Sequence, residues 1–144
     1  MVSARDNTIE RVGACHCGAI GFAYFTRLEP QSWSVRACQC RFCRAHRSRA
    51  TSDPAGTIRF NENIPDALVR YRFGQRSTDF LLCRHCGVYI GALMESAQGK
   101  FGIININALQ SIPSGLNQSE PREYGDETPD QRIARREALW SRVI

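Results

Sequence analysis

Short apolar runs separated by turn-forming residues occupy most of this chain. The runs are rich in aromatic and β-branched residues, and Gly, Pro, Asn or Asp stands between them, which is typical of strands joined by turns. The expected strands cover residues 20–25, 33–37, 57–60, 68–73, 79–82, 88–94 and 101–109. Their close spacing favours a mainly β fold, a small sandwich or open barrel of short antiparallel strands, over alternating βαβ units.

A helix is expected near the C-terminus, after a polar loop at residues 112–128. Thr128 can be its N-cap, with Pro129 at the first position and Gln131 completing a capping box. Its expected buried side consists of Ile133, Ala134, Trp140 and Ile144. Its arginines are expected to face solvent: Arg132, Arg135 and Arg136.

The length of 144 residues and the composition indicate one globular domain. We expect residues 1–10 to be a flexible N-terminus and residues 11–144 to form a single zinc-binding domain that includes the C-terminal loop and helix. No stretch approaches the roughly 20 apolar residues of a membrane span, and the first residues lack the apolar core of a signal peptide. The expected location is therefore the cytoplasm, where thiols stay reduced.

Four of the seven cysteines form two close pairs. Cys15 and Cys17 make a C-x-C motif before the first expected strand, and Cys83 and Cys86 make a C-x-x-C motif after the fifth. A glycine follows the second cysteine of each pair, which suits a tight turn around a tetrahedral metal ion. The two pairs complete one four-thiolate zinc site if the fold brings their turns together.

The remaining three cysteines, Cys38, Cys40 and Cys43, form a C-x-C-x-x-C motif. Three thiolates in six residues can hold one face of a zinc ion and leave the fourth position to be filled. His46 is the internal candidate, and its binding would close the site and make it structural. A water or substrate at that position would instead make the site catalytic.

Five arginines lie around this motif: Arg36, Arg41, Arg44, Arg47 and Arg49. They either balance the thiolate charge on a solvated surface or form an anion site beside the zinc, with Arg41 and Arg44 as candidate substrate-binding residues. With zinc on all seven thiolates, the formal charge of +5 falls to about +2, which weakens an inference of nucleic-acid binding from basicity.

Two further groups of residues carry weaker expectations. Asn105 and Asn107 alternate within the last expected strand, so they would share one face, and solvent is the favoured environment. The aromatic residues Tyr71, Phe73 and Tyr89 are expected to be in the core.

Four segments of the chain, taken in order, resemble the glutathione-dependent formaldehyde-activating enzyme family, which shares its domain with centromere protein V. The segments are GACHCGAI, CQCRFC, DFLLCRHCGVYIGA and GIININAL. The resemblance covers roughly residues 11–110 and the Arg-rich, Trp-containing C-terminal segment. It implies a β-tent-like fold, a structural zinc on Cys15, Cys17, Cys83 and Cys86, and a catalytic zinc on Cys38, Cys40 and Cys43. It also implies a carbon–sulfur lyase activity that forms or cleaves S-hydroxymethylglutathione from glutathione and formaldehyde.

The leading hypothesis is therefore an enzyme with two zinc ions that acts on a thiol–aldehyde adduct, with the thiol at an open three-cysteine zinc. Its partners would be a small-molecule thiol and an aldehyde, with no membrane and no nucleic acid. The alternative is a non-catalytic zinc-stabilised module that binds an acidic partner or nucleic acid, which predicts a closed middle site. A third hypothesis is a zinc or redox sensor with a labile middle site.

Overall fold

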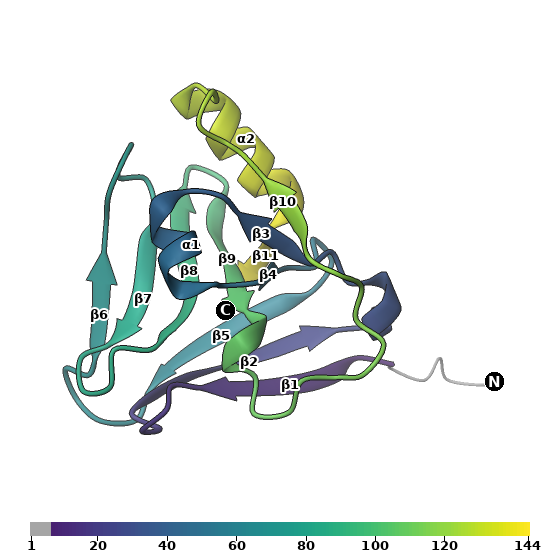
Figure 1. Cartoon of the computed structure of the whole chain (residues 1–144), viewed down its shortest axis with the longest axis vertical. Helices are drawn as coiled ribbons and strands as arrows, with labels where there is room; N and C mark the ends of the chain where they lie inside the picture. The colour runs from purple at the N-terminus through teal and green to yellow at the C-terminus, as the bar shows by residue number, and fades with distance from the viewer. Residues whose placement is uncertain (1–6) are drawn as a thin grey trace.

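A computed structural model describes residues 7–144 of the chain (Figure 1). The fold is mainly β with a helix near the C-terminus, which confirms the predicted class. Of the expected flexible N-terminus, residues 1–6 lie outside the described part. Residues 9 and 10 already belong to a strand, because they pair along the edge of the sheet with Phe25 and Thr26.

The strands of the described residues are β1 (Ile9–Ala14), β2 (Ile20–Thr26), β3 (Arg36–Cys38), β4 (Ala50–Thr51), β5 (Thr57–Glu62), β6 (Leu68–Tyr71), β7 (Asp79–Cys83), β8 (Tyr89–Ser96), β9 (Gly99–Asn105), β10 (Glu120–Arg122) and β11 (Ser141–Val143). The helices are α1 (Arg41–His46) and α2 (Pro129–Leu139), with short 3-10 turns at Pro30–Ser32 and Ile106–Ala108. In residues 7–144, no helix has the length and apolar character needed to cross a membrane.

All strands join one continuous sheet that branches at β9. One edge of β9 pairs first with β11 and then with β4, and the other edge pairs with β8, which leads to β7 and β6. Figure 1 shows β1, β2 and β5 as one wall and β6, β7 and β8 as another, with α1 above the space between them. Most pairings are antiparallel as predicted, but β10 pairs with β3 and β11 with β5 in parallel.

The main core lies between these walls. Its largest fully buried side chains include Tyr24 of β2, Ile58 of β5, Ile90 of β8 and Ile104 of β9. Trp33 packs edge-on against Tyr24, with ring centroids 5.4 Å apart, and its indole nitrogen donates to a backbone carbonyl. Burial of these large side chains is the main driving force that fixes the relative position of the walls.

Several expected strands have different limits in the structure. The run at residues 33–37 becomes a strand only at Arg36, because Trp33 turns into the core after a 3-10 turn. The run at residues 101–109 leaves the strand at Asn105 and continues as a 3-10 turn. The strands β1, β4, β10 and β11 were not predicted. β1 mixes polar and apolar residues, although it pairs with the next strand, β2. The other three have only two or three residues and pair with strands that are distant in sequence.

Helix α2 has the predicted start, and its predicted buried side is only partly buried: Ile133 is half-buried and packs against a core cluster that contains Trp140. The Thr128 hydroxyl accepts from the Gln131 amide and the Gln131 side chain accepts from the Thr128 amide, which completes the capping box. Trp140 is buried as expected, whereas Ala134 is exposed and Ile144 is 65% exposed.

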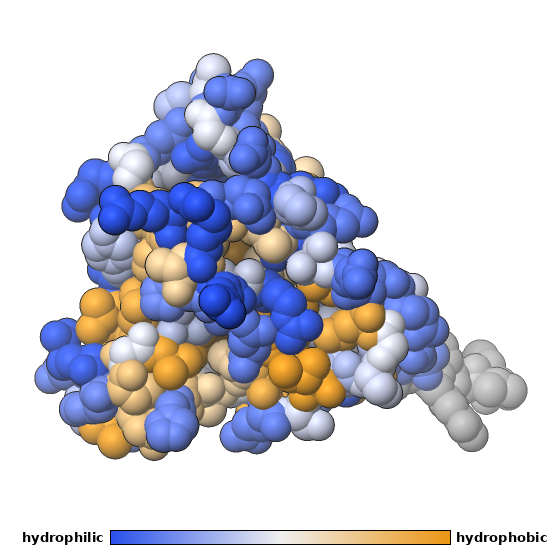
Figure 2. All heavy atoms as spheres, in the orientation of Figure 1, coloured by the Kyte–Doolittle hydropathy of each residue, from blue (hydrophilic) through white to orange (hydrophobic). Residues whose placement is uncertain are grey.

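The residue of α2 that is buried is Arg136, which was expected in solvent. Its guanidinium donates to the hydroxyls of Ser77 and Thr78 and packs over Trp140. These polar partners, in the loop before β7, make burial of an arginine possible, and the periodicity of α2 alone does not reveal them. Hydrophilic side chains cover the outer surface of α2 in Figure 2.

Candidate functional site

The four paired cysteines meet, as the sequence predicted, where the turn after β1 lies against the turn after β7. Cys17 Sγ lies 3.7 Å from Cys15 Sγ and 3.6 Å from Cys83 Sγ, and the Cys86 sulfur belongs to the same group. Four sulfurs around one zinc at 2.3 Å stand about 3.8 Å apart, so these distances fit a tetrahedral zinc. The group could therefore hold a metal ion.

Backbone geometry supports this four-thiol arrangement. The glycines after each pair, Gly18 and Gly87, have φ values of +82° and +79°, which a residue with a side chain rarely adopts. Backbone amides of Ile20 and Cys86 point at the sulfurs of Cys15 and Cys83 from 3.4 Å. Amide hydrogens directed at sulfur stabilise thiolate charge.

The three middle cysteines form a second group at the junction of β3 and α1. Cys38 ends β3, Cys40 is the N-cap of α1, and Cys43 lies in its first turn. Their sulfurs all lie within 4.8 Å of one another, so this group could also hold a metal ion. Hydrogen bonds from the Cys38 and Cys43 thiols lower the pKa of Cys40. Cys40 is therefore stabilised as the thiolate.

His46, the candidate fourth ligand, does not join the middle group. Its ring packs 4.6 Å from the ring of Phe42 and 5.5 Å from that of Tyr89. Among residues 7–144, no histidine or carboxylate lies with the three thiols as a fourth ligand. The described residues therefore supply only three donors.

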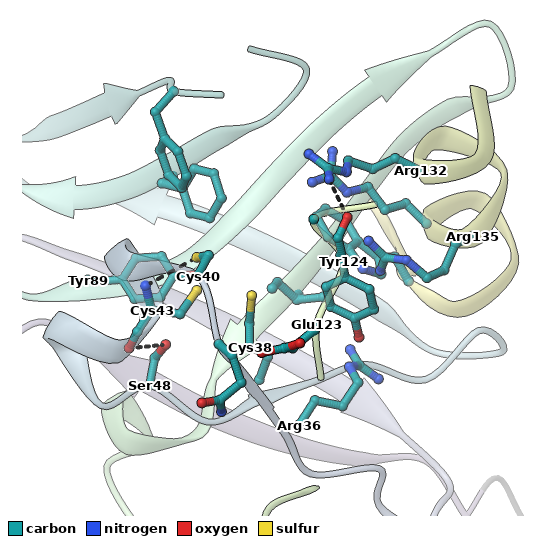
Figure 3. A pocket seen from close by; sticks show the side chains of 18 of the residues that line it. Arg36, Cys38, Cys40, Cys43, Ser48, Tyr89, Glu123, Tyr124, Arg132 and Arg135 are labelled. Carbon is teal, nitrogen blue, oxygen red and sulfur yellow. Dashed lines mark hydrogen bonds between the residues drawn. The ribbon is translucent and has the colours of Figure 1, made fainter. Parts of the chain in front are cut away.

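A cavity of about 500 Å³ opens beside this group (Figure 3). Cys38, Cys40 and Cys43 lie on one side of it, and Arg132 and Arg135 from α2 lie across from them. Its apolar wall consists of Ala50, Phe73, Phe80, Tyr89, Ile103 and Trp140. The cavity can therefore hold a small molecule with one end at the thiols and the other at the arginines of α2.

Two of these arginines are already paired with an acid. Arg135 forms a bidentate ion pair with Glu127 at 2.8 and 3.0 Å, and Arg132 contacts the same carboxylate at 3.4 Å. Arg135 also stacks over the ring of Tyr124 at 3.6 Å. The hydrogen bonds from Arg135 hold the pKa of Glu127 below its usual range, and the charge of Arg135 and the contact with Arg132 lower it further.

Two other arginines of the cavity, Arg36 and Arg136, are buried, each with 8% exposure. Arg36 donates to the hydroxyls of Ser34 and Ser52 at 3.1 and 2.8 Å. Burial and the nearby Arg135 and Arg132 lower the pKa of Arg136 to about 10, so its guanidinium remains charged at neutral pH.

Arg41 and Arg44, the candidate substrate-binding residues from sequence, are exposed on α1 and do not line the cavity. The arginines of α2 were not predicted as cavity residues from the sequence. Their spacing at positions 132, 135 and 136 places them on one helix face, which was the available signal. The sequence does not show that this face of α2 points toward the cavity.

Asn105 and Asn107 hold the loop after α1. They do not share a strand face, and only Asn107 is exposed to solvent as expected. Asn105 is buried and donates to the Tyr89 carbonyl at 2.9 Å. Asn107 donates to the Arg47 carbonyl and accepts from Arg49 Nε, both at 2.8 Å. These bonds attach the helix that carries Cys43 to the end of β9.

The three aromatic residues expected in the core belong to one cluster around Phe42. Tyr89 is buried, but Tyr71 is 47% exposed, and Phe73 is half-buried in the cavity wall. Phe73 stacks on Phe80 with ring centroids 4.7 Å apart. Three members of the cluster, Phe73, Phe80 and Tyr89, line the cavity beside the thiols.

A comparison with known proteins agrees with this site. A family model described as glutathione-dependent formaldehyde-activating enzyme matches residues 10–124. A crystal structure of a Rhodobacter sphaeroides protein is similar with a TM-score of 0.58 and 24% identity, over 77% of this chain and 99% of that one. That likeness supports the fold. The family match spans both cysteine groups, and this chain belongs to the glutathione-dependent formaldehyde-activating enzyme family.

Proposed function

We propose that this protein is a zinc-dependent carbon–sulfur lyase-type enzyme that forms or cleaves the adduct of glutathione and formaldehyde. The observation that carries the proposal is the three-thiol group beside a cavity of about 500 Å³ whose far side is basic. The family match supports glutathione and formaldehyde as the substrates.

The donor sets suit two zinc ions in different roles. We propose a structural ion on Cys15, Cys17, Cys83 and Cys86, because four thiolates complete a tetrahedron. The second ion would be held by Cys38, Cys40 and Cys43, with its fourth position facing the cavity. Zinc at such a site lowers the pKa of a bound thiol and polarises a carbonyl oxygen.

The protein's own residues would bind and shield the reactants. The reaction joins the thiolate sulfur to the aldehyde carbon, and the former carbonyl oxygen takes up a proton. It needs no covalent intermediate with the enzyme, so no nucleophilic side chain is required. Phe73, Phe80 and Tyr89 would exclude water from the thiol end of the cavity.

Two further observations bear on the alternatives. A purely structural middle site would use His46 as fourth ligand, and the packing of His46 on Phe42 and Tyr89 argues against it. All seven cysteines are free in the structure. We place the activity in the cytoplasm, because free thiols persist in a reducing compartment.

The test is exchange spectroscopy by NMR on the zinc-loaded protein with glutathione and ¹³C-formaldehyde. We expect S-hydroxymethylglutathione to form and break down faster than in buffer. The matched control is Cys40→Ser, which keeps the four-thiol group and should return the exchange rate to the spontaneous value. A wild-type protein with two bound zinc ions and only the spontaneous rate would overturn the proposal.

A further inference from the structure

A second cavity, of about 320 Å³, lies between the wall of strands β6 to β9 and helix α2. Among residues 7–144, it shares no lining residue with the cavity beside the three cysteines. Arg136 stands between the two, because it lines the first cavity and its guanidinium contacts Ser77 and Met94 in the wall of the second. The second cavity is therefore a separate candidate site.

Strand alternation supplies the basic side of this cavity. Arg70 and Arg72 are two positions apart at the end of β6, so their side chains lie on one face, and Tyr71 and Phe73 lie on the other. The aromatic face packs on Phe42. The arginine face lines the second cavity.

Positive side chains outnumber negative ones in the lining. Four cations against two acids leave a net charge of about +2, and the six residues are Arg70, Arg72, Arg76, Lys100, Asp79 and Glu95. Just behind the lining, Arg136 and Glu137 of α2 add one charge of each sign, through contacts with Ser77 and Ser96. The surplus is therefore positive after the neighbouring charges are included.

Asp79 positions two of the arginines and leaves most of their donors free. Arg70 Nη1 donates to Asp79 Oδ2 at 3.2 Å, and Arg72 Nε donates to Oδ1 of the same carboxylate. A guanidinium has five N–H donors, so each arginine keeps others for a ligand. One carboxylate also balances only one of the two charges.

Arg76 supplies the rest of the surplus charge. Lys100 lies opposite Glu95 in the β8–β9 pairing, which balances it, whereas Arg76 forms no ion pair or side-chain hydrogen bond with any residue of the part 7–144. Arg76 has a φ of +58°, a backbone conformation that residues with side chains rarely adopt. Its position in the loop between β6 and β7 brings an unpaired guanidinium to the cavity.

The remaining lining consists of a hydroxyl group and an apolar floor. Ser77 Oγ accepts from Arg136 Nη1 at 2.9 Å, so its own hydrogen points elsewhere and can be donated to a ligand. The floor is formed by Leu93, Met94 and Ile133. Hydrogen bonds to a charged group are stronger beside such a surface than in water.

We infer that this cavity binds the phosphate group of a small phosphorylated molecule. A phosphate monoester carries a charge of about −2 at pH 7, which matches the surplus of the lining, and arginine donors fit its oxygens. The apolar floor would contact the organic part of the molecule. Glutathione and formaldehyde contain no phosphate, so this ligand is distinct from the substrates of the proposed function and the inference does not depend on them.

The first experiment varies the ligand and leaves the protein unchanged. Nitrogen-15 NMR on the zinc-loaded chain follows titrations with phenyl phosphate, inorganic phosphate and benzoate. We expect phenyl phosphate to shift the Ser77 and Met94 amides with a Kd below about 1 mM, and the other two ligands to bind at least about tenfold more weakly. Inorganic phosphate lacks a group for the apolar floor, and benzoate has one charge in place of two.

Three results of these titrations would contradict the inference. Shifts confined to residues of the first cavity, such as Cys40 and Ala50, would place the anion there. Benzoate binding as tightly as phenyl phosphate would remove the preference for phosphate. Inorganic phosphate binding as tightly would show that the site takes the free ion and not a phosphorylated molecule.

The second experiment changes the charge of the lining in both directions. Arg76→Gln should weaken binding of phenyl phosphate about tenfold, and Glu95→Gln should tighten it a few-fold, because each removes one charge from the cavity. Both side chains are exposed, so the fold should tolerate the changes. The matched control is Arg59→Gln, which removes an exposed arginine of β5 outside both cavities and should leave the affinity unchanged.

The control distinguishes a site from general attraction to a basic protein. Equal weakening by Arg76→Gln and Arg59→Gln would overturn the inference, and so would an unchanged affinity in Arg76→Gln. If a variant loses its circular dichroism spectrum or its zinc, the ligand comparison on the unchanged protein decides.

Discussion

Cys17 Sγ and Cys83 Sγ lie 3.6 Å apart, although the two residues are 66 positions apart in the chain. Cys17 follows β1 in one wall of the sheet, and Cys83 ends β7 in the other. A metal ion on their group would therefore cross-link two walls that share no direct strand pairing. The bound ion would stabilise the folded protein, because a cross-link between distant segments restricts the unfolded chain.

Cys83→Ser should reduce the free energy of unfolding by about 4 kcal/mol or more, since loss of a metal site is among the largest effects of single substitutions. Urea unfolding measures the loss, and elemental analysis counts the bound zinc. Cys40→Ser is the control, because it removes a ligand of the middle group without touching this cross-link. Equal destabilisation by the two variants would contradict the assigned roles.

His46→Ala should leave zinc content at two ions per chain. The His46 ring packs on Phe42 and Tyr89 and supplies no donor to the thiols, so its removal costs only packing, about 1 kcal/mol. Elemental analysis and thermal unfolding give the two readouts. A loss of one zinc ion would show that His46 is a ligand after all.

Asn107→Ala should weaken zinc binding at the middle group by about 10- to 100-fold, as loss of groups that position metal ligands generally does. The variant loses the hydrogen bonds to the Arg47 carbonyl and from Arg49 Nε that hold the end of α1. Competition with a chromogenic chelator measures the affinity. Asn117→Ala removes a comparable exposed bond to the Gln31 carbonyl far from the thiols and should have no effect on the affinity.

Arg41 and Arg44 remain candidates for a role in substrate binding, which we propose is long-range attraction. Both are exposed on α1 next to the thiol group, so they can raise the association rate of an anionic thiol without touching it in the cavity. Arg41→Gln combined with Arg44→Gln should lower this rate a few-fold at low salt, with little change in dissociation. Stopped-flow measurements should show that the difference disappears at high ionic strength.

Glu127 should make the attachment of α2 sensitive to acid. Its pKa is lowered in the folded protein by Arg135 and Arg132, so its stabilising effect is complete above the usual value of 4.5 and is lost as the pH falls through the lowered pKa. Arg135→Gln should raise this pKa. Carbon-13 NMR of the carboxyl group measures it, and an identical titration of Glu127 in both proteins would contradict the assigned ion pair.

Local signals in the sequence identified several features well. The capping box at Thr128 and Gln131 involves residues three positions apart, so the sequence contains the whole interaction. The same holds for the thiols of Cys38, Cys40 and Cys43, which α1 and its N-cap bring together. Short strands such as β11 could not be found in this way, because Ser141–Val143 pairs with β5 and β9 rather than with neighbours in sequence.

The sequence by itself determined the division of the cysteines into four and three, the mainly β class and the start of α2, because closely spaced residues set each of these. Only the tertiary structure decided that the two cysteine pairs meet, that His46 turns to an aromatic cluster, and that Arg136 lines the cavity together with Trp140. The physical reason is that burial depends on partners. The hydroxyls of Ser77 and Thr78, nearly 60 positions away, are what allow a charged side chain to turn inward.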